Sequence, residues 1–325
     1  MKLLKKAISL TLVLALLALS CVSFASCGND GKYTIGICQL VTHDALDAAT
    51  QGFKDAIVEA LGAENVTFIE QNAGNDIPLC TTIANDFVSK NVDLIMANAT
   101  PALQAAASAT ADIPVLGTSV TEYGVALGIK DFDGLVGGNI SGTSDLAPLD
   151  EQAQMILDLC PNAEKIGLLY CSAEANSKYQ VEEVKKFLID KGVDAANIKE
   201  YAFTDSNDVA AVATTAAENS DVLYLPTDNT VASNTEIING ICLPKKVPIV
   251  AGEAGICAGC GIATLSISYY DLGYLTGQMA VKILTGEEKV SKMPIQYVTN
   301  LEKKYNQTIC AELGITVPEG YTPLG

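Results

Sequence analysis

Short apolar segments alternate with longer segments of helical periodicity along most of the chain. The first apolar segment covers residues 33–40, and the helical segment 45–61 that follows carries apolar residues spaced by four, at Ala49, Phe53 and Ile57. Strands joined by helices of this length form right-handed β-α-β units and hence parallel sheets. Helices cover both faces of such a sheet, so its strands are apolar throughout, as they are here. The pattern predicts an α/β fold with doubly wound parallel sheets.

The alternation occurs twice, and each copy predicts one lobe. Before residue 121 we predict strands at 33–40, 66–69, 93–97 and 113–117 and helices at 45–61, 76–89 and 101–111. After residue 145 we predict strands at 165–171, 198–202, 222–225, 247–251 and 262–268, helices at 149–159, 178–191, 207–218, 230–238 and 270–284, and a closing segment from 294. A chain of 325 residues suits two domains.

The glycine-rich segment 137–145 lies between the two copies. Its glycines permit unusual backbone angles, and its Ser, Thr, Asn and Asp side chains can cap a helix. We expect residues 137–140 to form a strand that crosses between the lobes, and residues 142–145 to face the interlobe cleft. Thr143→Val would then change binding more than folding. The predicted lobes comprise residues 33–140 with 262–290, and residues 141–258 with 291–325.

The N-terminal residues 1–27 have the features of a bacterial lipoprotein signal peptide. Three lysines precede an apolar run, and small residues stand directly before Cys27, the expected lipidation site. Cys21 is an alternative site, and an ordinary cleaved signal or an uncleaved anchor is an alternative interpretation. Residues 28–32 would be a short tether. We expect an extracytoplasmic protein held on the cytoplasmic membrane by its N-terminal lipid.

The composition excludes several classes of function. A net charge of −18 argues against nucleic-acid binding, which needs a basic surface. The sequence lacks phosphate-binding, nucleophile-elbow and dinucleotide-binding motifs, and one histidine leaves little for acid–base catalysis. We therefore expect no enzyme activity, no cofactor and no metal. Cys257 and Cys260 form the only C-x-x-C motif, in a predicted glycine-rich turn, and we interpret them as buried thiols or an incidental disulfide.

Each apolar strand ends in a polar loop that starts the next helix. In an open parallel sheet these loops lie at one edge, where ligands bind, and free N–H groups at helix starts favour an anion. Any helix also needs an N-cap, so a single capped loop has a purely structural explanation. The chain has no arginine to hold a carboxylate, which leaves helix-start N–H groups and Ser or Thr hydroxyls. Asp228, Glu174 and Glu253 can receive an ammonium group, so an amino-acid zwitterion fits the loops.

Five motifs in order resemble the ABC-transporter substrate-binding proteins of the tryptophan- and tyrosine-type uptake lipoprotein group. They are residues 39–47 (QLVTHDALD), 140–145 (ISGTSD), 174–177 (EANS), 228–233 (DNTVAS) and 269–280 (YYDLGYLTGQMA). The resemblance implies the type I periplasmic binding protein fold, with crossing hinge strands and a small molecule between the lobes. It implies ligand contacts from His43, Asn98, Thr100, Thr118, Ser119, Thr143, Ser144, Glu174, Asn176, Ser177, Asp228, Asn229 and Glu253.

The resemblance also implies a monomeric receptor that delivers its ligand to an ABC permease with a separate ATPase. Lobe closure would follow ligand entry by a hinge motion. Four alternatives remain: a ligand-sensor module, a sugar or nucleoside receptor of the same fold, a secreted hydrolase, and a LacI-type regulator. The missing tryptophan weakens the sugar alternative, and the absence of a DNA-binding headpiece before Tyr33 weakens the last.

Overall fold

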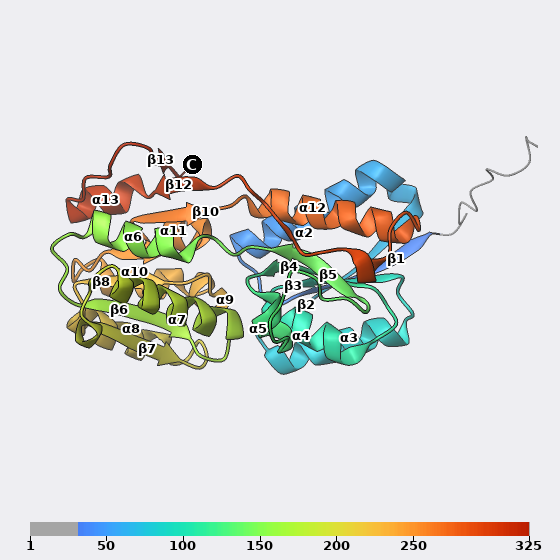
Figure 1. The fold of residues 1–325 in the computed structure, drawn as a ribbon, viewed down its shortest axis with the longest axis horizontal. Helices are drawn as coiled ribbons and strands as arrows, with labels where there is room; N and C mark the ends of the chain where they lie inside the picture. Colours follow the sequence, from blue (N-terminus) through green and yellow to red (C-terminus); the bar gives the residue numbers. More distant parts are fainter. Residues whose placement is uncertain (1–31, 325) are drawn as a thin grey trace, which may run out of the picture. The chain divides into compact units, whose positions relative to one another are not determined.

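The computed structural model describes residues 32–324, and residues 33–325 form one compact unit. The predicted signal peptide, its Cys21 and Cys27, and all of the tether except Lys32 lie outside the described residues. Two sheets are present, and we call each sheet with its helices a lobe. Figure 1 shows helices on both faces of each sheet. The prediction of two doubly wound parallel-sheet lobes is confirmed.

Lobe 1 is built on a six-stranded parallel sheet in the order β11-β5-β4-β3-β1-β2. Its strands are β1 (Tyr33–Gln39), β2 (Val66–Asn72), β3 (Leu94–Asn98), β4 (Val115–Val120), β5 (Ile140–Ser144) and β11 (Gln296–Tyr297). Its helices are α2 (Asp44–Leu61), α3 (Ile77–Ser89), α4 (Thr100–Ala109), α5 (Tyr123–Leu127) and α12 (Tyr269–Leu284), with short 3₁₀ turns η1 (Ala63–Asn65) and η3 (Val290–Lys292).

Lobe 2 repeats this plan with a seven-stranded sheet in the order β13-β12-β10-β9-β8-β6-β7. Its strands are β6 (Ile166–Cys171), β7 (Ile198–Phe203), β8 (Val222–Leu225), β9 (Ile249–Ala251), β10 (Ala263–Ser266), β12 (Glu302–Tyr305) and β13 (Thr322–Pro323). Its helices are α6 (Leu149–Leu159), α7 (Ala175–Asp190), α8 (Val209–Asn219), α9 (Asn229–Ala232), α10 (Thr235–Cys242), α11 (Ala254–Cys260) and α13 (Gln307–Leu313), with the 3₁₀ turn η2 (Ala195–Asn197). Only β12 runs antiparallel to its neighbour β10 among the described pairings.

Separate apolar clusters hold the helix layers to the two faces of each sheet. In lobe 1, α3 and α4 pack on one face around Phe87 and Leu103, and α2 and α12 pack on the other around Phe53 and Met279. Helices α2 and α12 lie side by side (Figure 1). A β-carbon at Gly52 would collide with the backbone of α12, so glycine permits this close approach.

The sheets correct the predicted boundaries between the lobes. Residues 137–139 are not a crossing strand, because Gly137 and Gly138 have φ angles of 76° and 59° and form a turn that leads into β5. Strand β5 pairs with β4 and β11 inside lobe 1, so the chain crosses after Ser144. The predicted strand 262–268 pairs as β10 with β9 and β12 in lobe 2 instead of lobe 1.

The chain therefore passes between the sheets three times. The first crossing runs from β5 to α6, the second from β10 to α12, and the third from β11 to β12. The third crossing places β11 in lobe 1, whereas the prediction assigned residues 291–325 to lobe 2. In both lobes the first strand lies between the second and third, so the polar loops after the parallel strands share one edge of each sheet.

Candidate functional site

A small cavity of about 10 Å³ lies where the strand-end loops of the two lobes meet. This volume is no more than a single water molecule needs, so a larger ligand enters only when the lobes separate. The cavity is lined by His43, Leu46, Ser119, Thr121, Asp145, Asn176, Thr227, Asp228, Asn229, Ala232, Glu253 and Tyr269. Of these, His43, Ser119, Asn176, Asp228, Asn229 and Glu253 belong to the contacts that the sequence predicts.

Two carboxylates reach the cavity as N-caps of short helices in lobe 2. Asp228 follows β8 and caps α9, where its Oδ1 accepts the N–H of Val231 at 2.8 Å. Its Oδ2 accepts the N–H of Cys171 at 2.6 Å. Glu253 follows β9 and caps α11, where it accepts the N–H of Gly255 at 2.6 Å. A polar residue directly after a buried strand is therefore both a cap and a wall of the cavity.

Glu174 supports this wall from behind. Its Oε1 accepts the backbone N–H of Thr230 at 2.9 Å and the Thr230 hydroxyl at 2.9 Å. Its Oε2 accepts the Asn229 backbone N–H at 3.2 Å and the side-chain amide at 2.6 Å. Glu174 is only 1% exposed and does not line the cavity. Its carboxylate holds the loop that carries Asp228 in place.

Asp145 is the one lining carboxylate with an oxygen that has no hydrogen-bond partner among the described residues. Its Oδ2 accepts the Tyr269 hydroxyl at 3.0 Å, and its Oδ1 is buried and unpaired. The hydroxyl oxygen of Ser119 and the amide oxygen of Asn176, both in the lining, are also buried and unpaired. Buried polar atoms normally have partners, so these three atoms are free to form hydrogen bonds with a polar group inside the cavity.

The cavity is acidic, and no lysine lines it. Burial raises the pKa of Asp145 to about 6, although the nearby Thr121 and the hydrogen bond from Tyr269 oppose the shift. Burial and the neighbouring Glu174 raise the pKa of Asp228. Burial also raises the pKa of Glu253, and the nearby His43 opposes that shift. Because ionised carboxylates are costly here, a cationic group in the cavity would stabilise the folded protein.

Two hydrogen bonds connect the lobes at the rim of the cavity. His43 Nε2 lies 3.3 Å from Asn229 Oδ1. The side-chain amide of Asn75 in lobe 1 donates to the Thr230 hydroxyl in lobe 2 at 3.1 Å. Thr230 in turn donates to Glu174. The hydrogen bond across the cleft is therefore connected to the carboxylate that holds the lobe 2 loop in place.

The other predicted contacts lie behind the cavity wall and do not line it. Asn98 donates to the Leu46 carbonyl at 2.8 Å and to Thr50 at 3.0 Å. Ser144 donates to the Thr121 carbonyl at 2.8 Å. The whole set outside the lining is Asn98, Thr100, Thr118, Thr143, Ser144, Glu174 and Ser177. The structure keeps all of them buried near the loops that the sequence selected.

Thr143→Val is expected to reduce stability and leave ligand affinity almost unchanged, the reverse of the sequence-based prediction. Thr143 is fully buried, and its hydroxyl lies 3.2 Å from the Thr118 hydroxyl and 2.8 Å from the Thr276 hydroxyl. Losing both contacts should lower the free energy of unfolding by about 1–2 kcal/mol. Urea unfolding and ligand titration of the same sample measure both effects, and an affinity loss without a stability loss would restore the original prediction.

The predicted ligand contacts do not include six lining residues, although residues 142–145 were expected to face the cleft: Leu46, Thr121, Asp145, Thr227, Ala232 and Tyr269. Asp145, Thr121 and Thr227 do follow β5, β4 and β8 closely, so the strand-end rule could have found them. Tyr269 opens α12 and lies in the YYDLGYLTGQMA motif, but its ring gave no sign of facing Asp145.

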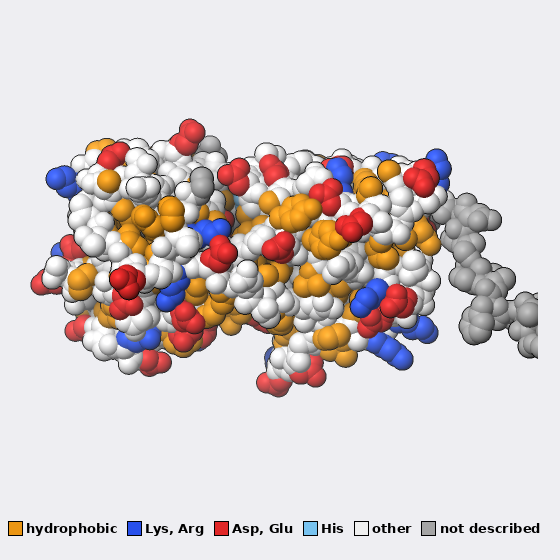
Figure 2. Space-filling view, turned by 90° about the horizontal axis from the view of Figure 1, so that it is seen from above, with side chains coloured by type: hydrophobic (Ala, Val, Ile, Leu, Met, Phe, Trp, Pro, Cys, Tyr) orange, Lys and Arg blue, Asp and Glu red, His pale blue; other side chains and the backbone are white. Residues whose placement is uncertain are grey.

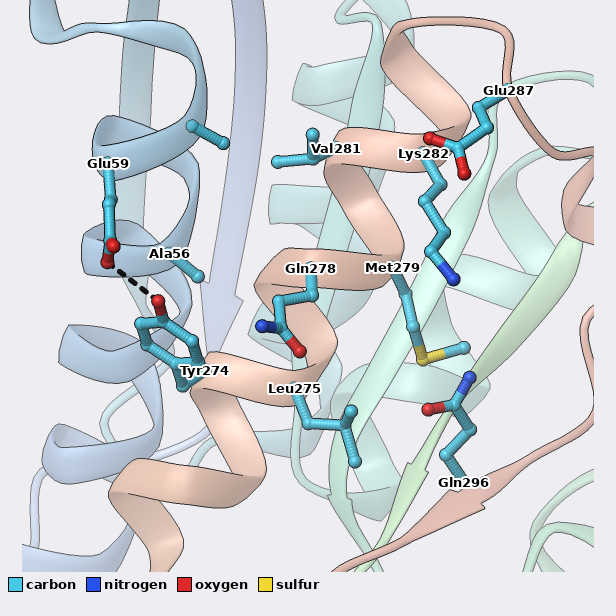
Figure 3. Close-up of a pocket in the computed structure, with 11 residues that line it drawn as sticks. Ala56, Glu59, Tyr274, Leu275, Gln278, Met279, Val281, Lys282, Glu287 and Gln296 are labelled. Carbon is cyan, nitrogen blue, oxygen red and sulfur yellow. Dashed lines mark hydrogen bonds between the residues drawn. The ribbon is translucent and has the colours of Figure 1, made fainter.

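Two larger cavities are present besides this one. One of about 570 Å³ is lined by α2 and α12 of lobe 1, with the Tyr274 hydroxyl donating to Glu59 at 2.6 Å (Figure 3). Figure 2 shows this side of the molecule, where hydrophobic patches lie among acidic side chains. A second cavity of about 570 Å³ runs from His43 to Ala232 and Gly259 and shares two lining residues with the small cavity between the lobes.

The eight cysteines in the described part of the chain are free thiols, and seven of them are buried. Cys257 and Cys260 lie on helix α11 and not in the expected turn. Residues 32–324 contain no cluster of His, Cys, Asp or Glu that could hold a metal ion. None of the helices in that range is long and apolar enough to cross a membrane.

Two doubly wound lobes, three crossing segments and a polar cavity between the lobes define a type I periplasmic binding protein fold. The chain belongs to the ABC transporter substrate-binding protein family, whose sequence model matches residues 34–322. It is therefore the substrate-binding component of an ABC transporter, which acts outside the cytoplasm and passes a small molecule to a permease.

Relatives with known names cover nearly the whole chain. The tyrosine-binding protein of Clostridioides difficile is 35% identical over 292 residues, which are 87% of this chain and 83% of that protein. A Streptococcus pneumoniae ABC domain solved with L-Trp is 33% identical, has a TM-score of 0.84, and covers 89% of this chain and 97% of its own. The ligand-free, open CD0873 of Clostridium difficile is 39% identical, has a TM-score of 0.67, and covers 90% and 99%.

The similarity scores agree with closed lobes. The structure superposes better on the tryptophan-bound relative than on the open one, although its sequence is more similar to the open one. The hydrogen bonds across the rim from His43 and Asn75 indicate the same closed arrangement.

Proposed function

We propose that this substrate-binding protein captures an amino acid, an aromatic one, as a zwitterion in the cavity between its lobes. The observation that carries the proposal is the unpaired Asp145 Oδ1 in an acidic cavity without lysine. An α-ammonium group at this oxygen would supply the missing donor and neutralise a buried carboxylate. The chain binds its ligand without turnover and acts as a monomer.

The ligand carboxylate requires donors that are not arginine. The unpaired Ser119 hydroxyl and the ring of His43 lie in the lining and provide them. Leu46, Ala232 and the Tyr269 ring offer apolar surface to the ligand side chain. The names of two relatives, a tyrosine-binding protein and a domain solved with L-Trp, favour an aromatic side chain.

A thermal-shift panel tests the proposal. Residues 32–325 are screened against the amino acids, then sugars and nucleosides. A ligand at 100 times its Kd should raise the free energy of unfolding by about 2.7 kcal/mol. We expect tyrosine or tryptophan to produce this shift. A shift with a sugar or nucleoside, and none with any amino acid, would show that the ligand is not an amino acid. The family assignment would be unaffected.

We further propose that Cys27 carries the lipid that holds the protein on the outer face of the cytoplasmic membrane. Small residues precede this cysteine after an apolar run, as in lipoprotein signals. Cys27→Ser is expected to abolish incorporation of a labelled fatty acid and to release the protein from the membrane fraction. Cys21→Ser is the matched control and should change neither. Loss of labelling in Cys21→Ser alone would show that Cys21, and not Cys27, carries the lipid.

A further inference from the structure

Asp145 and Tyr269 stand at the ends of two different crossing segments. Asp145 is the first residue after β5, where the chain leaves lobe 1. Tyr269 is the first residue of α12, where the chain returns from β10 to lobe 1. The hydrogen bond from the Tyr269 hydroxyl to Asp145 Oδ2, at 3.0 Å, therefore joins two hinge segments.

The ring of Tyr269 is firmly held. It belongs to a small apolar cluster with Ala45, Ala49 and Leu272, and Val298 of the third crossing packs against that cluster. Tyr269 is 7% exposed and Asp145 is 4% exposed. Both residues directly adjoin elements of lobe 1, β5 and α12, which move together when the lobes rotate about the hinge. The pair can thus stay together in the open form, in which the ligand enters.

We propose that Tyr269 is a positioning residue for ligand capture: its hydroxyl keeps Asp145 ionised and directs the free Oδ1 toward the ligand ammonium. The inference rests on the amino-acid function proposed above. A carboxylate fixed before binding costs less ordering free energy when the ligand arrives. The Tyr269 hydroxyl acts through Asp145 and supplies no charge of its own.

The groups around Asp145 make its ionisation depend on this bond. Glu253, Asp228 and His43 line the same cavity from the N-caps of α11, α9 and α2, and Tyr123 lies on the α5 side. Burial disfavours the charge on Asp145, and Glu253 adds to that effect. The nearby Thr121 and the hydrogen bond from Tyr269 oppose it by lowering the pKa of the carboxyl.

The test is the pH dependence of affinity in Tyr269→Phe, which keeps the ring and removes the hydroxyl. Tyrosine or tryptophan binding by residues 32–325 is measured between pH 5.5 and 8. Without the hydroxyl, Asp145 should protonate at higher pH, so the fall in affinity should move up by about half to one pH unit. Affinity should then be about two- to fivefold weaker than wild type at pH 6 and nearly equal at pH 8.

Tyr270→Phe is the matched control, because the Tyr270 hydroxyl binds the exposed Asp55 on the protein surface. It should follow the wild-type profile. A ratio of Tyr269→Phe to wild-type affinity that is constant over the whole pH range would overturn the proposal, since a purely structural loss does not depend on pH.

A second readout separates this inference from the proposed function. The carboxyl of Asp145 is titrated by NMR in the ligand-free protein, in wild type and in Tyr269→Phe. If the wild type binds no amino acid, the amino-acid function fails, and this titration still decides the inference. A higher pKa in Tyr269→Phe supports the positioning role, and an unchanged pKa overturns it.

Discussion

Asp145→Asn is expected to make the ligand-free protein more stable at pH 7 and to weaken amino-acid binding by at least about tenfold. The two effects have one cause. Burial raises the pKa of Asp145 from 3.8 to about 6. Between these two pH values the folded state therefore keeps a proton that the unfolded state has already lost. Stability therefore falls as pH rises through this window, by about 3 kcal/mol in total at pH 7.

The amide that replaces the Asp145 carboxyl in this variant stays neutral at every pH and can still accept the Tyr269 hydroxyl. We expect the free energy of unfolding at pH 7 to rise by about 2 kcal/mol, and the stability loss between pH 4 and 6 to become smaller. Part of that loss should remain, because burial raises the pKa of Asp228 and Glu253 as well. Urea unfolding across pH 4 to 8 and ligand titration at pH 7 measure both effects.

Asp112→Asn is a suitable control for Asp145→Asn, because Asp112 is exposed in the loop before β4 and does not line the cavity. It should change neither stability nor affinity. If Asp145→Asn lost stability at pH 7 and kept full affinity, Asp145 would be a structural residue and not the ammonium site.

Glu174→Ala is expected to lower the free energy of unfolding by about 3 kcal/mol or more and to abolish binding. The substitution leaves the backbone N–H groups of Asn229 and Thr230 buried without their acceptor. The same loop carries Asp228 and contacts Asn75 across the cleft. Glu174 itself does not line the cavity, so its removal weakens binding through the loop that it holds.

Denaturant unfolding and titration at low temperature, where the variant remains folded, measure these two losses. Glu182→Ala on the exposed face of α7 is the control, since its contact with Lys178 at 3.9 Å is a surface pair of little value. A stability loss below about 1 kcal/mol for Glu174→Ala would show that water replaces the carboxylate in this loop.

The sequence predicted the elements that have a clear periodic pattern. The helix at residues 149–159 and the strand at 222–225 have the predicted bounds, because their apolar spacing is unambiguous. Helix α11 was expected to be a glycine-rich turn. It is helical because Glu253 caps it and because Ile256, Cys257 and Cys260 are buried on one side. The glycines in this segment favoured the prediction of a turn over that of a helix.

The site was harder to predict because β5 carries no hydrophobic pattern. Its sequence ISGTS is small or polar at almost every position, so nothing in it fixes which face holds Thr143. The contact with Thr276 on α12 decides that face and turns Thr143 away from the cavity. The same ambiguity left Asp145 out of the predicted ligand contacts, although residues 142–145 were expected to face the cleft. Asp228 and Glu253 follow strongly apolar strands, and the strand-end rule found them.

A crystal structure of residues 32–325 with bound L-tyrosine or L-tryptophan tests the central claim most directly. The account predicts that the ligand lies in the cavity between the lobes, with its ammonium nitrogen about 2.8–3.0 Å from Asp145 Oδ1 and its carboxylate directed toward Ser119. A ligand bound elsewhere, or one whose ammonium group has no contact with Asp145, would contradict it.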